Sequence, residues 1–117
     1  MDANAQIIKS EGLFSDGWTG PRWRAVYAVP PETRKLELTV WSARRPEVPN
    51  GHEIRLETIL GHTVETVEPE TQLTLSVDVP EPLDGLVYFE LKSGFAGPPL
   101  GDDIRTLGVV VVSVVFS

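Results

Sequence analysis

Apolar and polar residues alternate with a period of two along most of this 117-residue chain. The alternation spans residues 22–29, 35–41, 53–60, 72–79 and 86–92. Successive side chains of a β-strand point to opposite faces, so each segment is predicted to be a strand with one buried and one solvated face. Gly, Pro, Asn and Asp residues separate the segments, which is typical of turns between short strands.

Residues 109–116 break this alternation, because valine or phenylalanine occupies almost every position. A strand that is apolar on both faces needs cover on both, so this last strand is predicted to be central in the fold. The alternative is that one of its faces docks on a partner domain or on a second copy of the chain.

Together with a short strand at residues 63–67, these segments give seven or eight strands at regular spacing. Such spacing is typical of an all-β protein, and it predicts a two-sheet antiparallel β-sandwich of jelly-roll or immunoglobulin-like topology. Residues 11–117 are predicted to form this single domain, and residues 1–10 to form an N-terminal arm or an extra strand.

The chain carries a formal net charge of −7, from 17 acidic and 10 basic residues. Such a charge gives little attraction for a nucleic acid backbone or an anionic membrane, so neither is an expected partner. The N-terminus lacks the pattern of a secretion signal, and the apolar run at the C-terminus is about half as long as a membrane-spanning helix. The absence of cysteine fits a reducing compartment. We therefore expect a cytoplasmic protein that does not insert into a membrane.

Residues with catalytic or metal-binding chemistry form no recognisable constellation. His52 and His62 are predicted at turns at opposite ends of one strand, too far apart to share a metal ion, so both are predicted to be solvated. Glu53 and Glu57 fall on one face of a strand, but the cleft that glycoside hydrolysis requires is not predicted around them. The serines lack the Gly-x-Ser-x-Gly motif of a nucleophile elbow. We therefore expect no enzymatic activity, no cofactor and no metal ion.

Three blocks of the sequence carry a resemblance to a known family: residues 11–23, residues 36–38 with 52–64, and residues 102–109. The third block contains Asp103-Ile104-Arg105-Thr106-Leu107-Gly108, which is similar to the Asp-x-Arg-x-Leu-Gly signature that opens the last strand in that family. The chain resembles the non-catalytic β-sandwich domains attached to bacterial glycosyltransferases and related enzymes of surface-polysaccharide assembly. This resemblance implies a carbohydrate-related setting and a glycosyltransferase domain as a partner.

Sugar binding is the function that the aromatic residues favour, because the C–H groups of a sugar ring stack on an aromatic face. Polar side chains would then orient the sugar hydroxyl groups through hydrogen bonds. The candidate stacking residues are Trp18, Trp41, Tyr88 and Phe95, and the candidate hydrogen-bonding residues are Arg22, Arg24 and Asp103. For Trp18 and Trp41, a place in the core or as a lid over it is the alternative.

Structural roles are predicted for a second group of residues: Trp23, Asp102, Arg105, Leu107 and Gly108. Trp23 shares a strand face with Ala25 and Tyr27, which indicates the core. Two adjacent acids beside an arginine make a poor calcium site, so Arg105 is predicted to pair with Asp103 or with loop carbonyl groups.

The sequence therefore leads to two alternative functions. The first is a non-catalytic carbohydrate-binding module that takes an oligosaccharide or polysaccharide. The second is a structural domain that docks or oligomerises a glycosyltransferase, for example as a homodimer, and has no ligand of its own. An exposed patch of aromatic rings favours the first function, and burial of every tryptophan favours the second.

Overall fold

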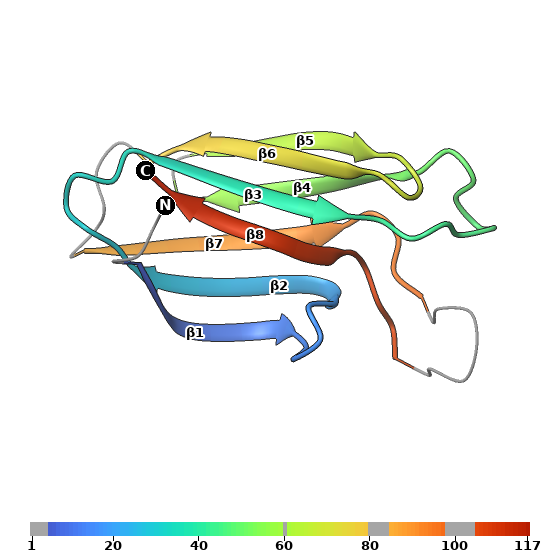
Figure 1. Cartoon of the computed structure of the whole chain (residues 1–117), viewed down its shortest axis with the longest axis horizontal. Coiled ribbons are helices and arrows are strands. Elements are labelled where there is room, and N and C mark those ends of the chain that lie inside the picture. The colour runs from blue at the N-terminus through green and yellow to red at the C-terminus, as the bar shows by residue number, and fades with distance from the viewer. Residues whose placement is uncertain (1–4, 60, 80–84, 98–104) are drawn as a thin grey trace.

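The computed structural model describes residues 5–59, 61–79, 85–97 and 105–117, and every regular element within them is a β-strand (Figure 1). The eight strands are β1 (Gln6–Leu13), β2 (Thr19–Ala28), β3 (Lys35–Trp41), β4 (His52–Thr58), β5 (Gly61–Val67), β6 (Gln72–Asp78), β7 (Leu86–Ser93) and β8 (Val110–Phe116). The prediction of an all-β protein is confirmed. None of the described residues forms a helix long and apolar enough to cross a membrane.

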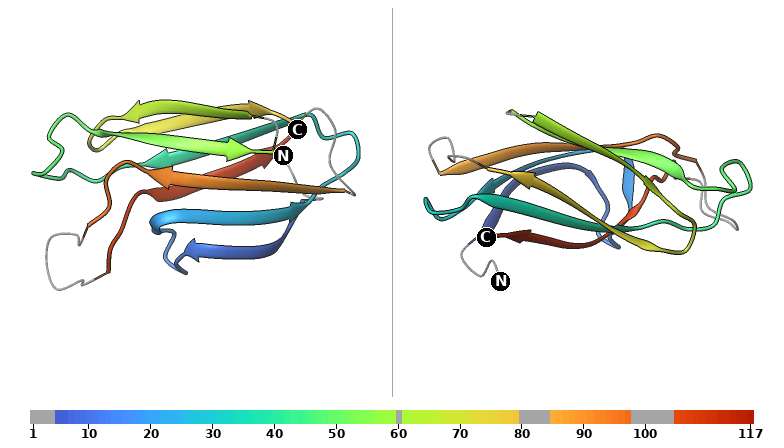
Figure 2. Two further views of the ribbon diagram at one scale, coloured as in Figure 1. Left: turned by 180° about the vertical axis from the view of Figure 1, so that it is seen from behind. Right: turned by 90° about the horizontal axis from the view of Figure 1, so that it is seen from above.

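The strands form two antiparallel sheets that pack face to face as the two layers of a sandwich (Figures 1 and 2). The five-stranded sheet has the order β1-β2-β7-β4-β5, and the three-stranded sheet has the order β6-β3-β8. The pairing of β4 with β5, β3 with β6 and β2 with β7 is nested, as in a long hairpin rolled into a jelly roll. In a complete jelly roll β1 would pair with β8, but here β1 pairs with β2 instead.

The core between the layers consists of the side chains that alternation predicts to point inward. Residues of both sheets are almost fully buried: Trp23, Ala25, Ile54, Leu56, Phe89 and Leu91 from the five-stranded sheet, and Leu36, Leu38, Val40 and Leu75 from the three-stranded sheet. The rings of Trp23 and Phe89 pack edge to face with centroids 5.1 Å apart. Trp23 Nε1 donates a hydrogen bond of 2.9 Å to Ser10 Oγ, so β1 is tied to the core through a polar contact. The core assignment of Trp23 is therefore confirmed.

The prediction that the last strand is central is wrong. β8 is an edge strand, and among the described residues it pairs with β3 and with one isolated bridge partner, Trp18 opposite Val110. The physical reason is the pairing of β1 with β2, which leaves the outer edge of β8 without a neighbouring strand in the described part of the chain. The inward residue Phe116 is buried, whereas Val112, at an irregularity of the register, is 47% exposed. One face of β8 therefore packs in the core, and its apolar residues on the other face lie on the outer surface of the three-stranded sheet.

Candidate functional site

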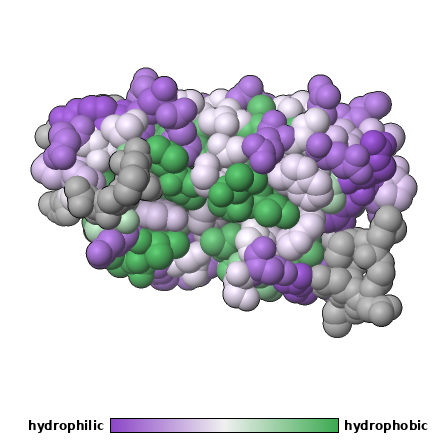
Figure 3. Space-filling view, viewed as in Figure 1, coloured by the Kyte–Doolittle hydropathy of each residue, from purple (hydrophilic) through white to green (hydrophobic). Residues whose placement is uncertain are grey.

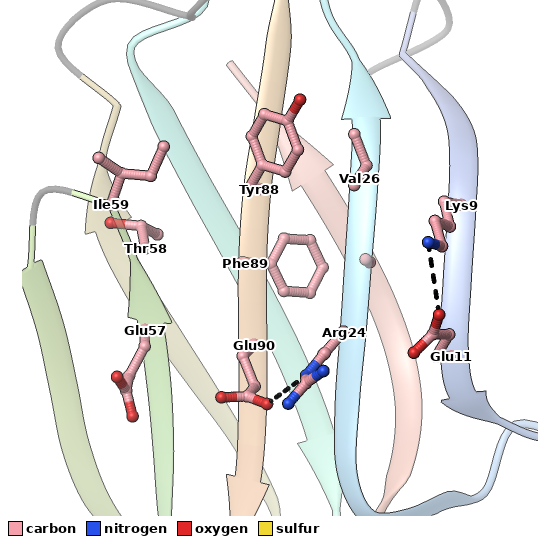
Figure 4. A pocket seen from close by; sticks show the side chains of 11 residues that line it. Lys9, Glu11, Arg24, Val26, Glu57, Thr58, Ile59, Tyr88, Phe89 and Glu90 are labelled. Carbon is pink, nitrogen blue, oxygen red and sulfur yellow. Dashed lines mark hydrogen bonds and ion pairs between the residues drawn. The ribbon is translucent and has the colours of Figure 1, made fainter.

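A hollow of about 620 Å³ lies on the outer face of the five-stranded sheet, over β1, β2, β7 and β4 (Figure 4). The side chains around it belong to residues that alternate with the core residues of the same strands, so the sheet itself holds them in place. They are Lys9, Glu11, Arg24, Val26, Glu57, Ile59, Tyr88 and Glu90. A hollow of this volume is within the range of sites for small ligands.

One border of the hollow is a charged row that crosses four strands. Directly opposed residues place Glu11 beside Arg24, Arg24 beside Glu90, and Glu90 beside Glu57. Arg24 Nε donates a hydrogen bond of 2.8 Å to Glu90 Oε2, which Figure 4 draws as a dashed line. Lys92 Nζ lies 2.9 Å from Glu57 Oε1 and 3.6 Å from Glu90 Oε1. The charged row is thus a network of ion pairs, and its members hold one another in position.

Glu57 and Glu90 of the charged row are ionised at neutral pH. The hydrogen bond from Lys92 holds the pKa of Glu57 below its ordinary value, and the hydrogen bond from Arg24 does the same for the pKa of Glu90. The row therefore presents carboxylate acceptors beside guanidinium and ammonium donors.

Tyr88 lies on the same face of β7 as Glu90 and two residues before it, and its ring lies between Val26 and Ile59 in the view of Figure 4. Tyr88 is 42% exposed and Ile59 is 69% exposed, whereas the neighbouring Phe89 points into the core and is buried. Val26 is directly opposite Tyr88 and Lys9 is opposite Val26. The hollow thus combines an aromatic ring, aliphatic neighbours and a line of hydrogen-bonding groups.

Other candidate aromatic residues lie at the end of the sandwich, away from this hollow. Trp18 and Phe95 flank the buried guanidinium of Arg45, whose Cζ atom is 5.7 Å and 5.5 Å from the respective ring centroids. Arg45 also donates hydrogen bonds to the carbonyl oxygens of Gly97, at 3.0 Å, and Leu107, at 3.2 Å. These contacts hold the loop after β7 against the segment that leads into β8.

Trp41 ends β3 on the outer face of the three-stranded sheet. It is directly opposite Val110, which in turn bridges to Trp18, so the two tryptophans flank Val110. Both tryptophans are half-buried and Trp23 is buried, so the three tryptophans are neither all exposed nor all buried. The candidate ligand residues thus divide into two places: Arg22, Arg24 and Tyr88 lie on the outer face of the five-stranded sheet, and Trp18, Trp41 and Phe95 lie elsewhere.

The turn that leads into β8 is tied down by contacts that the sequence did not predict. Arg105 pairs with Asp16 at 2.9 Å, and its Cζ atom lies 4.8 Å from the ring centroid of Phe14. This hydrogen bond holds the pKa of Asp16 below its ordinary value. The predicted partner Asp103 lies outside the described residues, as does Asp102.

Leu107 and Gly108 have close contacts in the same region. Leu107 is fully buried, and its backbone exchanges two hydrogen bonds with Gly97, at 2.9 and 3.0 Å. A Cβ atom on Gly108 would overlap Ser93 Oγ and press against the carbonyl oxygen of Gly20, so the close packing requires glycine.

The prediction of a solvated His52 is wrong, whereas His62 is exposed as predicted. His52 is 7% exposed, its ring centroid is 6.2 Å from that of Phe95, and neither ring nitrogen has a hydrogen-bond partner among the described residues. The sequence places His52 beside a turn, but alternation along β4 turns its side chain inward with Ile54 and Leu56. Burial lowers the pKa of His52, and the positive charge of Arg45 lowers it further.

Sequence reasoning did not select Arg45, Glu57, Glu90 or Lys92 as site residues. Arg45 has no signal, because it lies in a polar loop after β3. Alternation does predict that Glu90 and Lys92 face away from the core, but only the strand order places them beside Arg24 and Glu57.

Comparison of the chain with known protein families, with curated proteins and with solved structures found no match. Among the residues that the structure describes, no group of three or more His, Cys, Asp or Glu side chains is placed to hold a metal ion.

We predict that His52 makes the stability of the domain depend on pH. Its pKa is lowered in the folded state, so the unfolded chain binds the proton more tightly, and the stability that neutral His52 provides is lost as the pH falls below about 6.5. The free energy of unfolding, measured with urea between pH 7.5 and 5.5, should fall by up to about 1.4 kcal/mol per pH unit. His52→Phe should remove this loss, and the control His62→Gln should keep it. An equal loss in both variants would contradict the assignment to His52.

Proposed function

We propose that this domain is a non-catalytic carbohydrate-binding module whose ligand, an oligosaccharide or polysaccharide, lies in the hollow on the outer face of the five-stranded sheet. The observation that carries the proposal is the half-exposed ring of Tyr88 beside the charged row. A sugar ring has an apolar C–H face that stacks on an aromatic ring, and hydroxyl groups that need both donors and acceptors. Tyr88 offers the ring, Arg24 offers donors, and Glu90 offers acceptors.

The ion pairs of the charged row also support binding, because they order the polar side chains before a ligand arrives. Arg24 and Glu90 are joined at 2.8 Å, and Lys92 and Glu57 at 2.9 Å. Side chains that are already held in one geometry lose little conformational freedom on binding, which favours affinity.

The protonation states of Glu57 and Glu90 favour binding over hydrolysis. A glycoside hydrolase needs one carboxyl group with a raised pKa to protonate the leaving group. Here the pKa values of both glutamates are lowered by their hydrogen bonds to Lys92 and Arg24. The pair therefore provides two acceptors and lacks a general acid at neutral pH.

The biological setting of this proposal rests on the sequence resemblance alone. We place the domain in the cytoplasm beside a bacterial glycosyltransferase of surface-polysaccharide assembly, on the basis of the signature at residues 103–108. In that setting a binding module would hold the growing polysaccharide near the enzyme. A glycosyltransferase domain joined to this one, or a separate enzyme that co-purifies with it, would support the placement.

We predict that Tyr88→Ala weakens sugar binding about tenfold, because stacking on the ring is lost. A glycan array identifies the ligand, and isothermal titration calorimetry measures the dissociation constants of the wild type and the variant. Trp41→Ala is the matched control, since Trp41 lies on the outer face of the other sheet. If Trp41→Ala removes binding and Tyr88→Ala does not, the ligand lies on the three-stranded sheet and the proposed location is wrong.

The open edge of β8 favours a second candidate function, self-association with a second copy of the chain. Lys35 and Ser117 exchange two backbone hydrogen bonds, at 2.9 and 3.0 Å, which close the pairing of β3 with β8. Backbone groups alternate in direction along a strand, so residues 114 and 116 turn their amide and carbonyl groups toward the open edge. Antiparallel pairing of two β8 strands about a two-fold axis would satisfy these groups.

The uncharged and apolar surface around β8 also favours pairing with a second copy of the chain. Residues 109–117 carry no charge, and apolar surface lies over β8 and the beginning of β1 (Figure 3). The exposed apolar residues there are Ile7, Ile8 and Val112. A second β8 strand would occupy the position that β1 leaves vacant beside β8, and would shield these side chains.

We predict that the wild type is a dimer by multi-angle light scattering and that Val112→Lys is a monomer, because a lysine on the edge opposes strand pairing. Val64→Lys is the matched control and should remain dimeric, since Val64 is a similarly exposed valine, at 40%, on the outer face of the other sheet. A wild type that is monomeric at the highest soluble concentration would eliminate this second function.

A further inference from the structure

Positive charge is concentrated on the outer face of the five-stranded sheet. The basic residues that point outward there are Lys9, Arg22, Arg24, Arg55 and Lys92, half of the ten in the chain. The acidic residues on the same face are Glu11, Glu53, Glu57 and Glu90. This face therefore has a net charge of +1, whereas the whole chain has −7, so the remainder of the chain has −8. The hollow therefore lies on a face whose net charge is slightly positive, in a chain whose net charge is negative.

Three of these cations form a cationic row next to the charged row. Arg22 is directly opposite Lys92, and Lys92 is directly opposite Arg55. Like charges in direct cross-strand register repel one another, so the row costs stability unless anions neutralise it. Glu57 neutralises part of it, at 2.9 Å from Lys92 and 3.1 Å from Arg55.

Arg22 is the residue of the cationic row that is available to an anion from a ligand. It is exposed and has no ion-pair partner among the described residues. Its positive charge contributes to the lowered pKa of Glu90, together with those of Lys92 and Arg24. A planar guanidinium binds a carboxylate through two parallel hydrogen bonds, so a carboxylate group is the natural partner for Arg22.

We propose that the ligand of the hollow is an acidic oligosaccharide that carries carboxylate groups, as uronic acids do, and that it lies along β7 with one ring on Tyr88 and a carboxylate on Arg22. This inference rests on the proposed function. Tyr88 and Lys92 are four residues apart on one strand, about 13 Å, and Arg22 lies beside Lys92. A ligand that contacts both ends is therefore longer than one sugar ring.

The density of charge distinguishes an acidic oligosaccharide from a nucleic acid. The four carboxylates on this face repel a chain with a phosphate on every unit, and a net charge of +1 is too small to release many counterions. Carboxylates spaced along a sugar chain can meet Arg22 while the neighbouring hydroxyl groups meet the glutamates. The face therefore favours sparse negative charge together with many hydroxyl groups.

The test compares uronate-containing oligosaccharides with the same oligosaccharides after chemical reduction of their carboxyl groups, on an array and by calorimetry. We expect the acidic set to bind at least about tenfold more tightly than the reduced set, with an affinity that falls as salt rises. Equal binding of both sets would overturn this inference and leave the proposed function intact. No binding of either set would overturn both this inference and the proposed function. Tighter binding of a single-stranded RNA oligonucleotide would mean that the ligand is a nucleic acid and would overturn the inference.

Two substitutions then test whether the carboxylate of the ligand binds at Arg22. Arg22→Gln should weaken binding of the acidic set about tenfold, leave binding of the reduced set unchanged and lower the salt dependence. Arg44→Gln is the matched control, because Arg44 is an exposed arginine in the loop after β3 and the same charge is removed. Equal effects of the two substitutions would mean that only net charge matters, and the assignment of Arg22 would be wrong. Equal melting temperatures of the variants exclude a loss of folding.

Discussion

Burial of alternate residues of β7 between the two sheets is the constraint on which the rest of the structure depends. Val87, Phe89 and Leu91 are buried, and burial of each side chain stabilises the fold by about 2 kcal/mol. A slip of one residue would turn all three toward solvent and place Tyr88 and Glu90 in the core. The register that protects the core therefore also determines which side chains face outward, and so builds the hollow and the cationic row.

The position of β1 shapes the remainder of the molecule. Because β1 pairs with β2, one sheet has five strands and the other has three, and β8 keeps an open edge. In our proposals, a ligand would bind the outer face of the wider sheet and a second copy would pair with the edge of β8. Ligand binding and self-association thus use different surfaces, and both can belong to one protein.

At the end of the sandwich where β7 leads toward β8, the loops are held together by a buried cation, the guanidinium of Arg45. Arg45 lies between the rings of Trp18 and Phe95 and donates hydrogen bonds to two backbone carbonyl groups, which offset the cost of its burial. Burial lowers the pKa of the nearby His52, and the positive charge of Arg45 lowers it further, so His52 is neutral at neutral pH. Two residues that look like surface residues in the sequence thus form part of the interior.

Alternation along the chain was enough to predict the all-β class and the inward residues of β2, β3, β4 and β7, because strand periodicity is local. Side-chain chemistry selected Tyr88, Arg22 and Arg24, and alternation places all three on the outer face, where they do lie. Alternation did not predict arrangements that depend on contacts far apart in sequence. The edge position of β8 depends on the partner of β1, and Arg105 pairs with Asp16, 89 residues away. Nothing in the local sequence distinguishes these arrangements from their alternatives.

We propose that the outer face of the five-stranded sheet is the binding surface. Amide chemical-shift mapping by nuclear magnetic resonance, during titration with the best-binding acidic oligosaccharide, tests it most directly. We expect the largest changes at outward-facing residues of β7 and of its neighbours β2 and β4. Changes that cluster around Arg45 and Trp18 at the end of the sandwich, with β7 unaffected, would contradict it.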